Sequence, residues 1–301
     1  MQPHDWSGVF SAITTPFRDD LSVDHAFLAR HVAWLVDHGV RGIVPLGSLG
    51  EGATLSPAEK LEVLATCRRA TAGRVPLVAG IGTLATGDAV ALARGAERVG
   101  CDGLMVLPPY VYRGDGRETL AHLSAVIDAT PLPCMLYNNP IAYGTDVTPA
   151  QLGLLARHAN LQAVKESSGD IRRVTEIGER HGDRFRVFVG MDDVIVEGIA
   201  AGAVGWIAGL VNALPDESVR LFELAVAGRV EEARELYHRF LPLLRLDTVP
   251  KFVQLIKLVQ QEVEMGTARV RPPRLELAGD EREHALALIR GQLAALPQRA
   301  A

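Results

Sequence analysis

Short runs of apolar and β-branched residues alternate along the chain with longer stretches in which apolar residues recur at helical spacing. The helical stretches include residues 24–38, 57–70 and 87–98. The apolar runs predict eight strands, over residues 8–14, 42–46, 76–80, 103–107, 133–137, 162–165, 186–190 and 205–209. Each is apolar on both faces, as parallel strands covered by helices are. The pattern therefore predicts a repeated βα unit.

Eight βα repeats that close at about residue 225 predict an α/β fold, a (β/α)8 TIM barrel over residues 1–225, because this fold usually takes roughly 250 residues. The remainder, residues 226–301, is predicted to be a C-terminal helical region. After Pro215 the chain shows only helical stretches, at 217–227, 230–244, 249–263 and 281–296. A doubly wound open sheet is disfavoured, because residues 14–17 after the first strand contain no GxGxxG fingerprint.

Composition narrows the possible partners. The 301 residues are 48% hydrophobic and 22% charged, with a net charge of −5 and no blocks of one sign. Nucleic acid and anionic membrane surfaces are therefore poor partners. No apolar run approaches the roughly 20 residues of a membrane span, and no basic segment precedes an apolar run at the N-terminus, so we expect a cytoplasmic protein. Cys67, Cys101 and Cys134 form no CxxC pair and are expected to be reduced and packed.

Lys165 is the candidate nucleophile. It ends a buried strand, and the carboxyl ends of barrel strands carry the active site. Desolvation there lowers the pKa of a lysine and frees the amine to attack a carbonyl or an imine. The alternative is a buried ion pair with Glu166 or with a residue of a neighbouring strand, and position alone leaves both interpretations open. The other lysines, Lys60, Lys251 and Lys257, fall on amphipathic helices, where we expect solvated ammonium groups.

Two further features share that end of the predicted barrel. Tyr137 ends the preceding strand, and a phenol beside Lys165 can move protons, although buried tyrosines with one hydrogen-bond partner are common. A glycine-rich turn, Gly47-Ser48-Leu49-Gly50, follows the second strand, and its amides can hold a carboxylate. We expect Ser48 to pass a proton to Tyr137, and Gly47 and Leu49 to contact the substrate.

Motifs for other chemistries are missing. The sequence contains no HExxH, no EF-hand loop, no GxSxG elbow and no close cluster of Cys and His. We therefore expect no metal and no cofactor, and a small molecule as the only substrate.

Three blocks of sequence resemble the signature blocks of the dihydrodipicolinate synthase and N-acetylneuraminate lyase family. They are GSLGE at 47–51, YNNP at 137–140 and VKESSG at 164–169, and residues 8–17 and 190–193 also match. The resemblance implies a TIM barrel with a helical tail that forms a homotetramer or homodimer. It implies Lys165 as the Schiff-base lysine and Tyr137 as proton shuttle. We expect Gly190 and Ile207 to bind the substrate.

Departures from the synthase pattern direct the choice of activity. Ser48 and Leu49 stand where the synthases have two threonines, Ala142 stands where they have an arginine, and Val111 stands near the place of a tyrosine lent by a neighbouring subunit. With residues 205–211, these blocks are most similar to 1-pyrroline-4-hydroxy-2-carboxylate deaminases of hydroxyproline catabolism. The expected reaction is conversion of that cyclic imine to 2,5-dioxopentanoate and ammonia on Lys165.

Other activities remain open. The same lysine and tyrosine would serve an aldolase or dehydratase of a sugar-derived 2-oxo acid, such as a 2-keto-3-deoxy acid or a sialic-acid-like compound, or a dihydrodipicolinate synthase. A ligand-binding regulator without catalysis is disfavoured, because Lys165 and Tyr137 are both present.

Overall fold

Eight parallel strands form a nearly closed barrel in the computed structural model, which describes residue 1 and residues 5–296. The strand order is β2-β1-β8-β7-β6-β5-β4-β3, and a parallel bridge between Ile43 and Leu77 joins the two ends. The predicted TIM barrel is confirmed. Its strands are β1 (Gly8–Ala12), β2 (Gly42–Val44), β3 (Val78–Ile81), β4 (Gly103–Val106), β5 (Cys134–Asn138), β6 (Leu161–Glu166), β7 (Arg186–Val189) and β8 (Gly205–Ala208).

Twelve α-helices lie in the described part of the chain: α1 (His25–Asp37), α2 (Pro57–Thr71), α3 (Thr86–Val99), α4 (Gly116–Ile127), α5 (Pro140–Tyr143), α6 (Pro149–Leu155), α7 (Arg172–His181), α8 (Ile195–Ala200), α9 (Pro215–Val226), α10 (Val230–Leu244), α11 (Phe252–Glu262) and α12 (Gly279–Ala295). The helix predicted at 249–263 begins later than expected. Residues 245–247 form a 3-10 turn, and Pro250 disfavours helical backbone at Val249.

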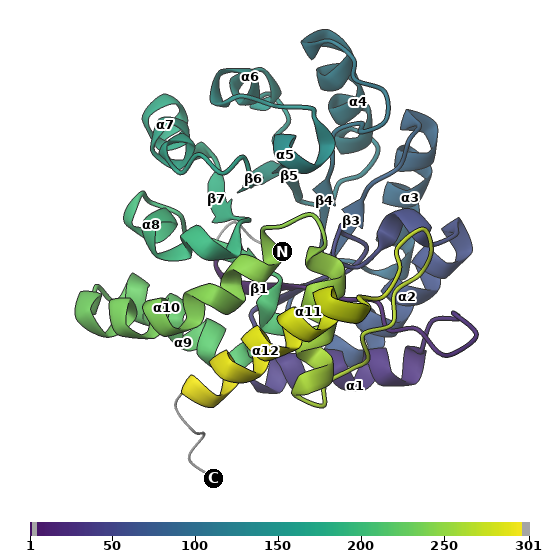
Figure 1. The fold of residues 1–301 in the computed structure, drawn as a ribbon. Helices are drawn as coiled ribbons and strands as arrows, with labels where there is room; N and C mark the ends of the chain where they lie inside the picture. Colours follow the sequence, from purple (N-terminus) through teal and green to yellow (C-terminus); the bar gives the residue numbers. More distant parts are fainter. Residues whose placement is uncertain (2–4, 297–301) are drawn as a thin grey trace.

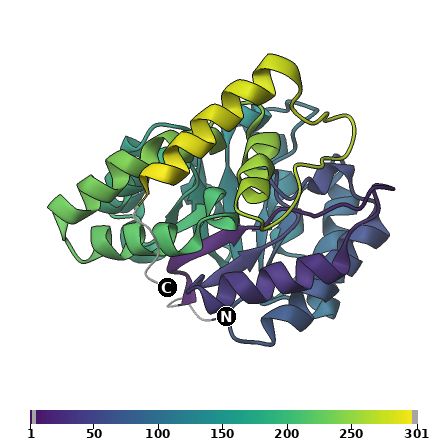
Figure 2. The ribbon, with the colours of Figure 1, turned by 60° about the horizontal axis from the view of Figure 1, so that its bottom comes forward.

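The helices after the barrel pack against one another and against its β8 side. Figures 1 and 2 show α12 running beside α10 and α11, and α11 also contacts the turn Leu210–Asn212 that follows β8. The C-terminal helices therefore reach the end of the barrel where strands finish. The domain boundary at residues 225 and 226 stays a prediction.

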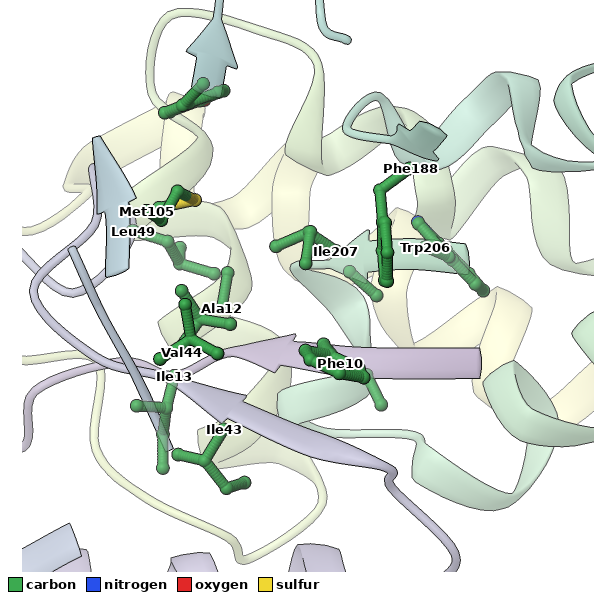
Figure 3. Close-up of a cluster of buried hydrophobic side chains, with 14 of the residues drawn as sticks. Phe10, Ala12, Ile13, Ile43, Val44, Leu49, Met105, Phe188, Trp206 and Ile207 are labelled. Atoms are coloured by element: carbon green, nitrogen blue, oxygen red, sulfur yellow. The ribbon is translucent and has the colours of Figure 1, made fainter. Parts of the chain in front are cut away.

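Aromatic side chains fill one part of the barrel interior. Phe10 and Phe188, from β1 and β7, meet edge to face with ring centroids 5.2 Å apart, and Ile207 lies near them (Figure 3). These contacts bring β1, β7 and β8 together around a dry centre. The three cysteines are buried and free of disulfides. No helix among the described residues is long and apolar enough to cross a membrane.

The expectation for the helical lysines was wrong in two cases. Lys60 is buried, and desolvation lowers its pKa. Lys257 is only 1% exposed, because its ammonium group is bonded to Glu51 in the interior. Lys251 is exposed as expected and pairs with Glu281 at 2.6 Å. Helical spacing predicted which face of each helix is apolar. It did not show that other segments of the chain also cover the lysines on the polar faces.

His31 couples the stability of the barrel to pH. The ring is fully buried in α1, and Nε2–H donates to the carbonyl of Asn212 at 2.8 Å. Burial lowers the pKa of His31 from 6.5 to about 4. The folded protein therefore resists protonation at a pH where the unfolded chain accepts it.

We expect the free energy of unfolding to fall by roughly 3 kcal/mol as pH drops from about 6.5 to about 4, through His31 alone. The sign follows from the lowered pKa, because the unfolded state binds more protons in this window. Urea unfolding of the wild type and His31→Gln at several pH values measures the difference. The exposed His238→Gln serves as control. Equal pH slopes for wild type and His31→Gln would contradict the prediction.

Candidate active site

One cavity of about 450 Å³ contains every predicted site residue. Its lining includes Gly47, Ser48, Leu49, Tyr137, Lys165, Gly190 and Ile207. These residues come from the carboxyl ends of β2, β5, β6, β7 and β8 or the turns that follow them. The tertiary structure thus brings all of them to one place, while their chemical roles remain predictions.

Lys165 lies inside this cavity at the end of β6 and is 6% exposed. Its Nζ is 4.1 Å from the ring centroid of Tyr137, and the parallel register of β5 and β6 places these residues side by side. Glu166 accepts hydrogen bonds from Ser168 N and Asn138 Nδ2, and no ion pair joins it to Lys165 among the described residues. The ion-pair alternative is therefore not what the structure shows.

Gly190 makes room for the lysine side chain. A Cβ added there would lie 2.5 Å from Lys165 Cε and 1.9 Å from Ser167 Oγ. Any other residue would push the lysine out of its path into the cavity. Gly190 was expected to bind the substrate, and its observed contact is with the nucleophile.

Tyr143 is a site residue that the sequence analysis missed. Its hydroxyl is hydrogen-bonded to the hydroxyl of Ser48, and its ring meets the ring of Tyr137 edge to face at 6.0 Å. Ser48, expected to contact Tyr137, therefore reaches Tyr143 instead. The hydroxyl of Tyr137 accepts a hydrogen bond from Asn139 Nδ2 at 2.9 Å. Burial raises the pKa of Tyr143, so its phenol keeps its proton at neutral pH.

The single turn α5 explains how Tyr143 arrives there. The side chain of Asn139 accepts a hydrogen bond from Ala142 N and caps the turn, which begins with Pro140. Tyr143 is the last residue of α5, and its ring also lies 5.5 Å from that of Tyr110. An asparagine cap followed by proline was the signal that could have indicated this turn.

The glycine turn is held by the C-terminal region. Lys257 on α11 donates to Glu51 Oε1 at 2.5 Å and to the carbonyl of Thr15 at 2.8 Å. Glu51 Oε2 accepts from Arg271 N at 3.0 Å. Burial lowers the pKa of Lys257 to about 8, and the charge of Glu51 opposes that change. This buried pair fastens the turn that carries Ser48.

Two ionisable residues of the C-terminal region also line the cavity, and the sequence analysis missed both. One is Asp247, at the end of a 3-10 turn. The other is Arg274, whose side chain is 27% exposed and whose Nη1 lies 3.9 Å from Glu51 Oε2. Each lies more than 80 residues along the chain from Lys165, and no local pattern links them to it. Arg274 brings positive charge to a pocket wall in which position 142 is alanine.

The fold and this cavity define a class of protein. A TIM barrel with a buried lysine at a strand end, against a tyrosine and with no ion-pair partner in the described part of the chain, has the arrangement of enzymes that act through an imine on lysine.

Comparison with known proteins identifies the family within that class. Residues 5–292 match the model of the Dihydrodipicolinate synthetase family, and the chain belongs to this family. A protein of Caldicellulosiruptor saccharolyticus named 4-hydroxy-tetrahydrodipicolinate synthase is 35% identical over 272 residues, which are 90% of each chain. One of the same name from Methanothrix thermoacetophila is 34% identical over 280 residues, 92% of this chain and 93% of the relative.

Solved structures agree with the sequence relatives. The dihydrodipicolinate synthase of Aquifex aeolicus is 28% identical, with a TM-score of 0.90 over 95% of this chain and 97% of that one. The chloride-inhibited dihydrodipicolinate synthase of Acinetobacter baumannii, complexed with pyruvate, is 27% identical, with a TM-score of 0.89 over 95% of this chain and 98% of that one.

The expected 1-pyrroline-4-hydroxy-2-carboxylate deaminase activity is wrong by these comparisons, which favour the synthase alternative. The deaminase interpretation depended on fewer positions than the family assignment, and these included Leu49 and Ala142. Both are apolar parts of the cavity wall. The missing arginine at 142 does not leave the cavity without positive charge, because Arg274 lines it from the C-terminal region. Deamination and hydroxyproline catabolism receive no support.

Proposed function

We propose that this protein is a Schiff-base lyase that condenses pyruvate with an aldehyde, and that its product is 4-hydroxy-tetrahydrodipicolinate. The observation that carries the proposal is the buried Lys165 side chain, which lines the cavity and whose Nζ lies 4.1 Å from the centroid of the Tyr137 ring. The names of the relatives supply the product, and the Acinetobacter structure with pyruvate supplies one reactant.

In the proposed reaction, the amine of Lys165 attacks C2 of pyruvate, and loss of water gives an iminium ion. In this proposal Tyr137, whose ring centroid lies 4.1 Å from Lys165 Nζ, accepts a proton from the methyl carbon, which leaves an enamine. The enamine carbon attacks the aldehyde and forms a carbon–carbon bond. The amino group of the aldehyde substrate then attacks the iminium carbon, which closes the ring as a cyclic imine and releases Lys165.

Proton transfer in this scheme uses groups from one chain. The Ser48 and Tyr143 hydroxyls are bonded to each other, and the Tyr143 ring contacts Tyr137. We infer that this pair exchanges the proton of Tyr137 with the cavity. The tyrosine lent by a neighbouring subunit, expected from the family, is then not needed for this step.

Anion binding is assigned to two places. The amides of Glu51 and Gly52 are bonded within the glycine turn, to Ser48 O and Gly47 O, so the amides of Ser48 and Leu49 are assigned to the pyruvate carboxylate. Arg274 is assigned to a carboxylate on the second reactant. The second reactant can be read from the product. Hydrolysis of the ring imine of 4-hydroxy-tetrahydrodipicolinate, with cleavage of the carbon–carbon bond beside its hydroxyl-bearing carbon, gives pyruvate and an amino-aldehyde with one carboxylate, aspartate 4-semialdehyde.

The assay for this function supplies pyruvate and aspartate 4-semialdehyde and follows the cyclic product by mass spectrometry. We expect product with this aldehyde and at least about tenfold lower kcat/KM with glyceraldehyde, which lacks the carboxylate that Arg274 would bind. Condensation with glyceraldehyde alone would overturn the synthase proposal in favour of a sugar-acid aldolase. Failure of pyruvate to form any borohydride-trapped adduct would overturn the Schiff-base proposal as a whole.

We also propose that the protein forms a homotetramer or homodimer in the cytoplasm. Val111, Tyr112 and Ile141 support an oligomer, because they are 72%, 64% and 66% exposed, and Ile141 also lines the cavity.

A further inference from the structure

Two acidic side chains meet at Gly209, directly after β8. The carboxylate of Asp192 accepts hydrogen bonds from Trp206 Nε1 at 2.9 Å, Gly209 N at 3.1 Å and Leu210 N at 2.8 Å. The carboxyl group of Asp247 lies against the same glycine, where an added Cβ would be 2.1 Å from Asp247 Oδ1. Only a glycine at 209 leaves room for both groups.

Asp247 differs from Asp192 in its partners. Its Oδ1 is buried and has no hydrogen-bond partner among the described residues. The side chain remains partly exposed where it lines the cavity that contains Lys165. A buried oxygen without a donor destabilises the folded protein, so a residue kept in this state needs a reason beyond stability.

The surroundings of Asp192 and Asp247 favour a negative charge on only one of these two carboxyl groups. Three N–H donors favour the ionised form of Asp192, whose pKa burial still raises to about 6. Burial and the neighbouring charge of Asp192 raise the pKa of Asp247 well above its usual range, while the charge of Lys165 opposes both shifts. Ionisation is thus favoured on Asp192, and the proton is favoured on Asp247.

We propose that Asp247 is the acid that protonates the aldehyde oxygen of the second reactant as the carbon–carbon bond forms. The inference depends on the proposed condensation. It follows from the position of an unpartnered carboxyl group in the wall of the cavity that holds the lysine. The other polar groups described above are already assigned, to the proton of Tyr137 or to carboxylates.

The step balances without any other reagent. The enamine electron pair on Lys165 forms the new bond to the aldehyde carbon, and the carbonyl π pair moves to oxygen. That oxygen takes the proton of Asp247 and becomes a hydroxyl group. Asp247 is left as a carboxylate while the nitrogen of Lys165 becomes a cationic iminium, so the negative charge develops as a positive charge appears nearby. Ring closure by the amino group of the aldehyde substrate releases Lys165 as an amine together with one proton, and Asp247 takes up that proton.

Asp247→Asn tests the role, because asparagine keeps the size and a hydrogen-bond donor but has no acidic proton. We measure two rates on the intact enzyme: deuterium exchange into the methyl group of pyruvate in D₂O, and condensation with aspartate 4-semialdehyde. The first reports formation of the enamine, and the second also requires the new bond. Condensation is expected to fall roughly 100-fold, and exchange by less than about threefold.

Asp193→Asn is the matched control, because Asp193 belongs to the same acidic group but is not among the residues that line the cavity. It should change condensation less than about threefold. Equal losses of exchange and condensation in Asp247→Asn would overturn the proposal, since Asp247 would then act only on Lys165 or on folding. A wild type that exchanges deuterium but condenses no aldehyde would overturn the proposed function, a result visible without the variant.

Discussion

Lys165→Ala should lower kcat/KM for the condensation on the order of 10⁴-fold, because the variant cannot form the imine that stabilises the carbanion. The folded structure should persist, since Lys165 makes no ion pair with Glu166 and its amine faces the cavity. Intact-protein mass after incubation with pyruvate and borohydride is the direct measurement. Wild type should gain the mass of one reduced pyruvate adduct, and Lys165→Ala should gain none.

Lys251→Ala controls for adventitious modification of lysine, because Lys251 is exposed and is not among the residues that line the cavity. It should form the adduct as wild type does. An adduct of full yield on Lys165→Ala would show that another amine is the nucleophile. Buried Lys257 would then be the first residue to examine.

Lys257→Met should destabilise the protein by about 3–5 kcal/mol, the cost of leaving one member of a buried ion pair unpaired. Lys257 and Glu51 are 1% and 0% exposed, and the ammonium group also donates to the carbonyls of Thr15 and Arg269. Removing it leaves the Glu51 carboxylate and these carbonyls without their donor. Urea unfolding at neutral pH measures the loss.

Two comparisons make this result specific. Lys251→Met removes an exposed pair with Glu281 and should cost no more than about 1 kcal/mol. Adding Glu51→Gln to Lys257→Met should recover part of the loss, because the unpaired charge is removed. A Lys257→Met protein as stable as Lys251→Met would show that the buried pair contributes little.

Much of the architecture could be predicted from local patterns. Eight apolar runs marked the eight strands, with ends within a few residues of those observed. Because parallel strands of a barrel all finish at one end, a residue that ends a strand or begins the next loop has a known location. This reasoning predicted that Lys165, Tyr137 and the turn with Ser48 lie at the same end of the barrel, and in the structure they line one cavity.

Side-chain partners across elements could not be predicted in the same way. The periodicity of α11 showed an apolar face but not that Lys257 would be covered by the turn that holds Glu51. Tyr143 contacts Ser48, which is 95 residues away, only because α5 folds back towards the cavity. The prediction of a deaminase was wrong for a related reason. An alanine at position 142 does not reveal that a distant segment brings the charge of Arg274 to the cavity.

The order of apolar and polar residues therefore determined the barrel and the strand end that carries Lys165, because periodicity and strand ends are local properties of the chain. The family followed from the resemblance of three short sequence blocks. Only the tertiary structure decided how the lysine is surrounded. Asp247 and Arg274 come from the segments between the helices after the barrel, and their positions depend on how α10, α11 and α12 pack on it. Packing between distant segments sets burial, and burial sets which of two neighbouring carboxyl groups keeps its proton.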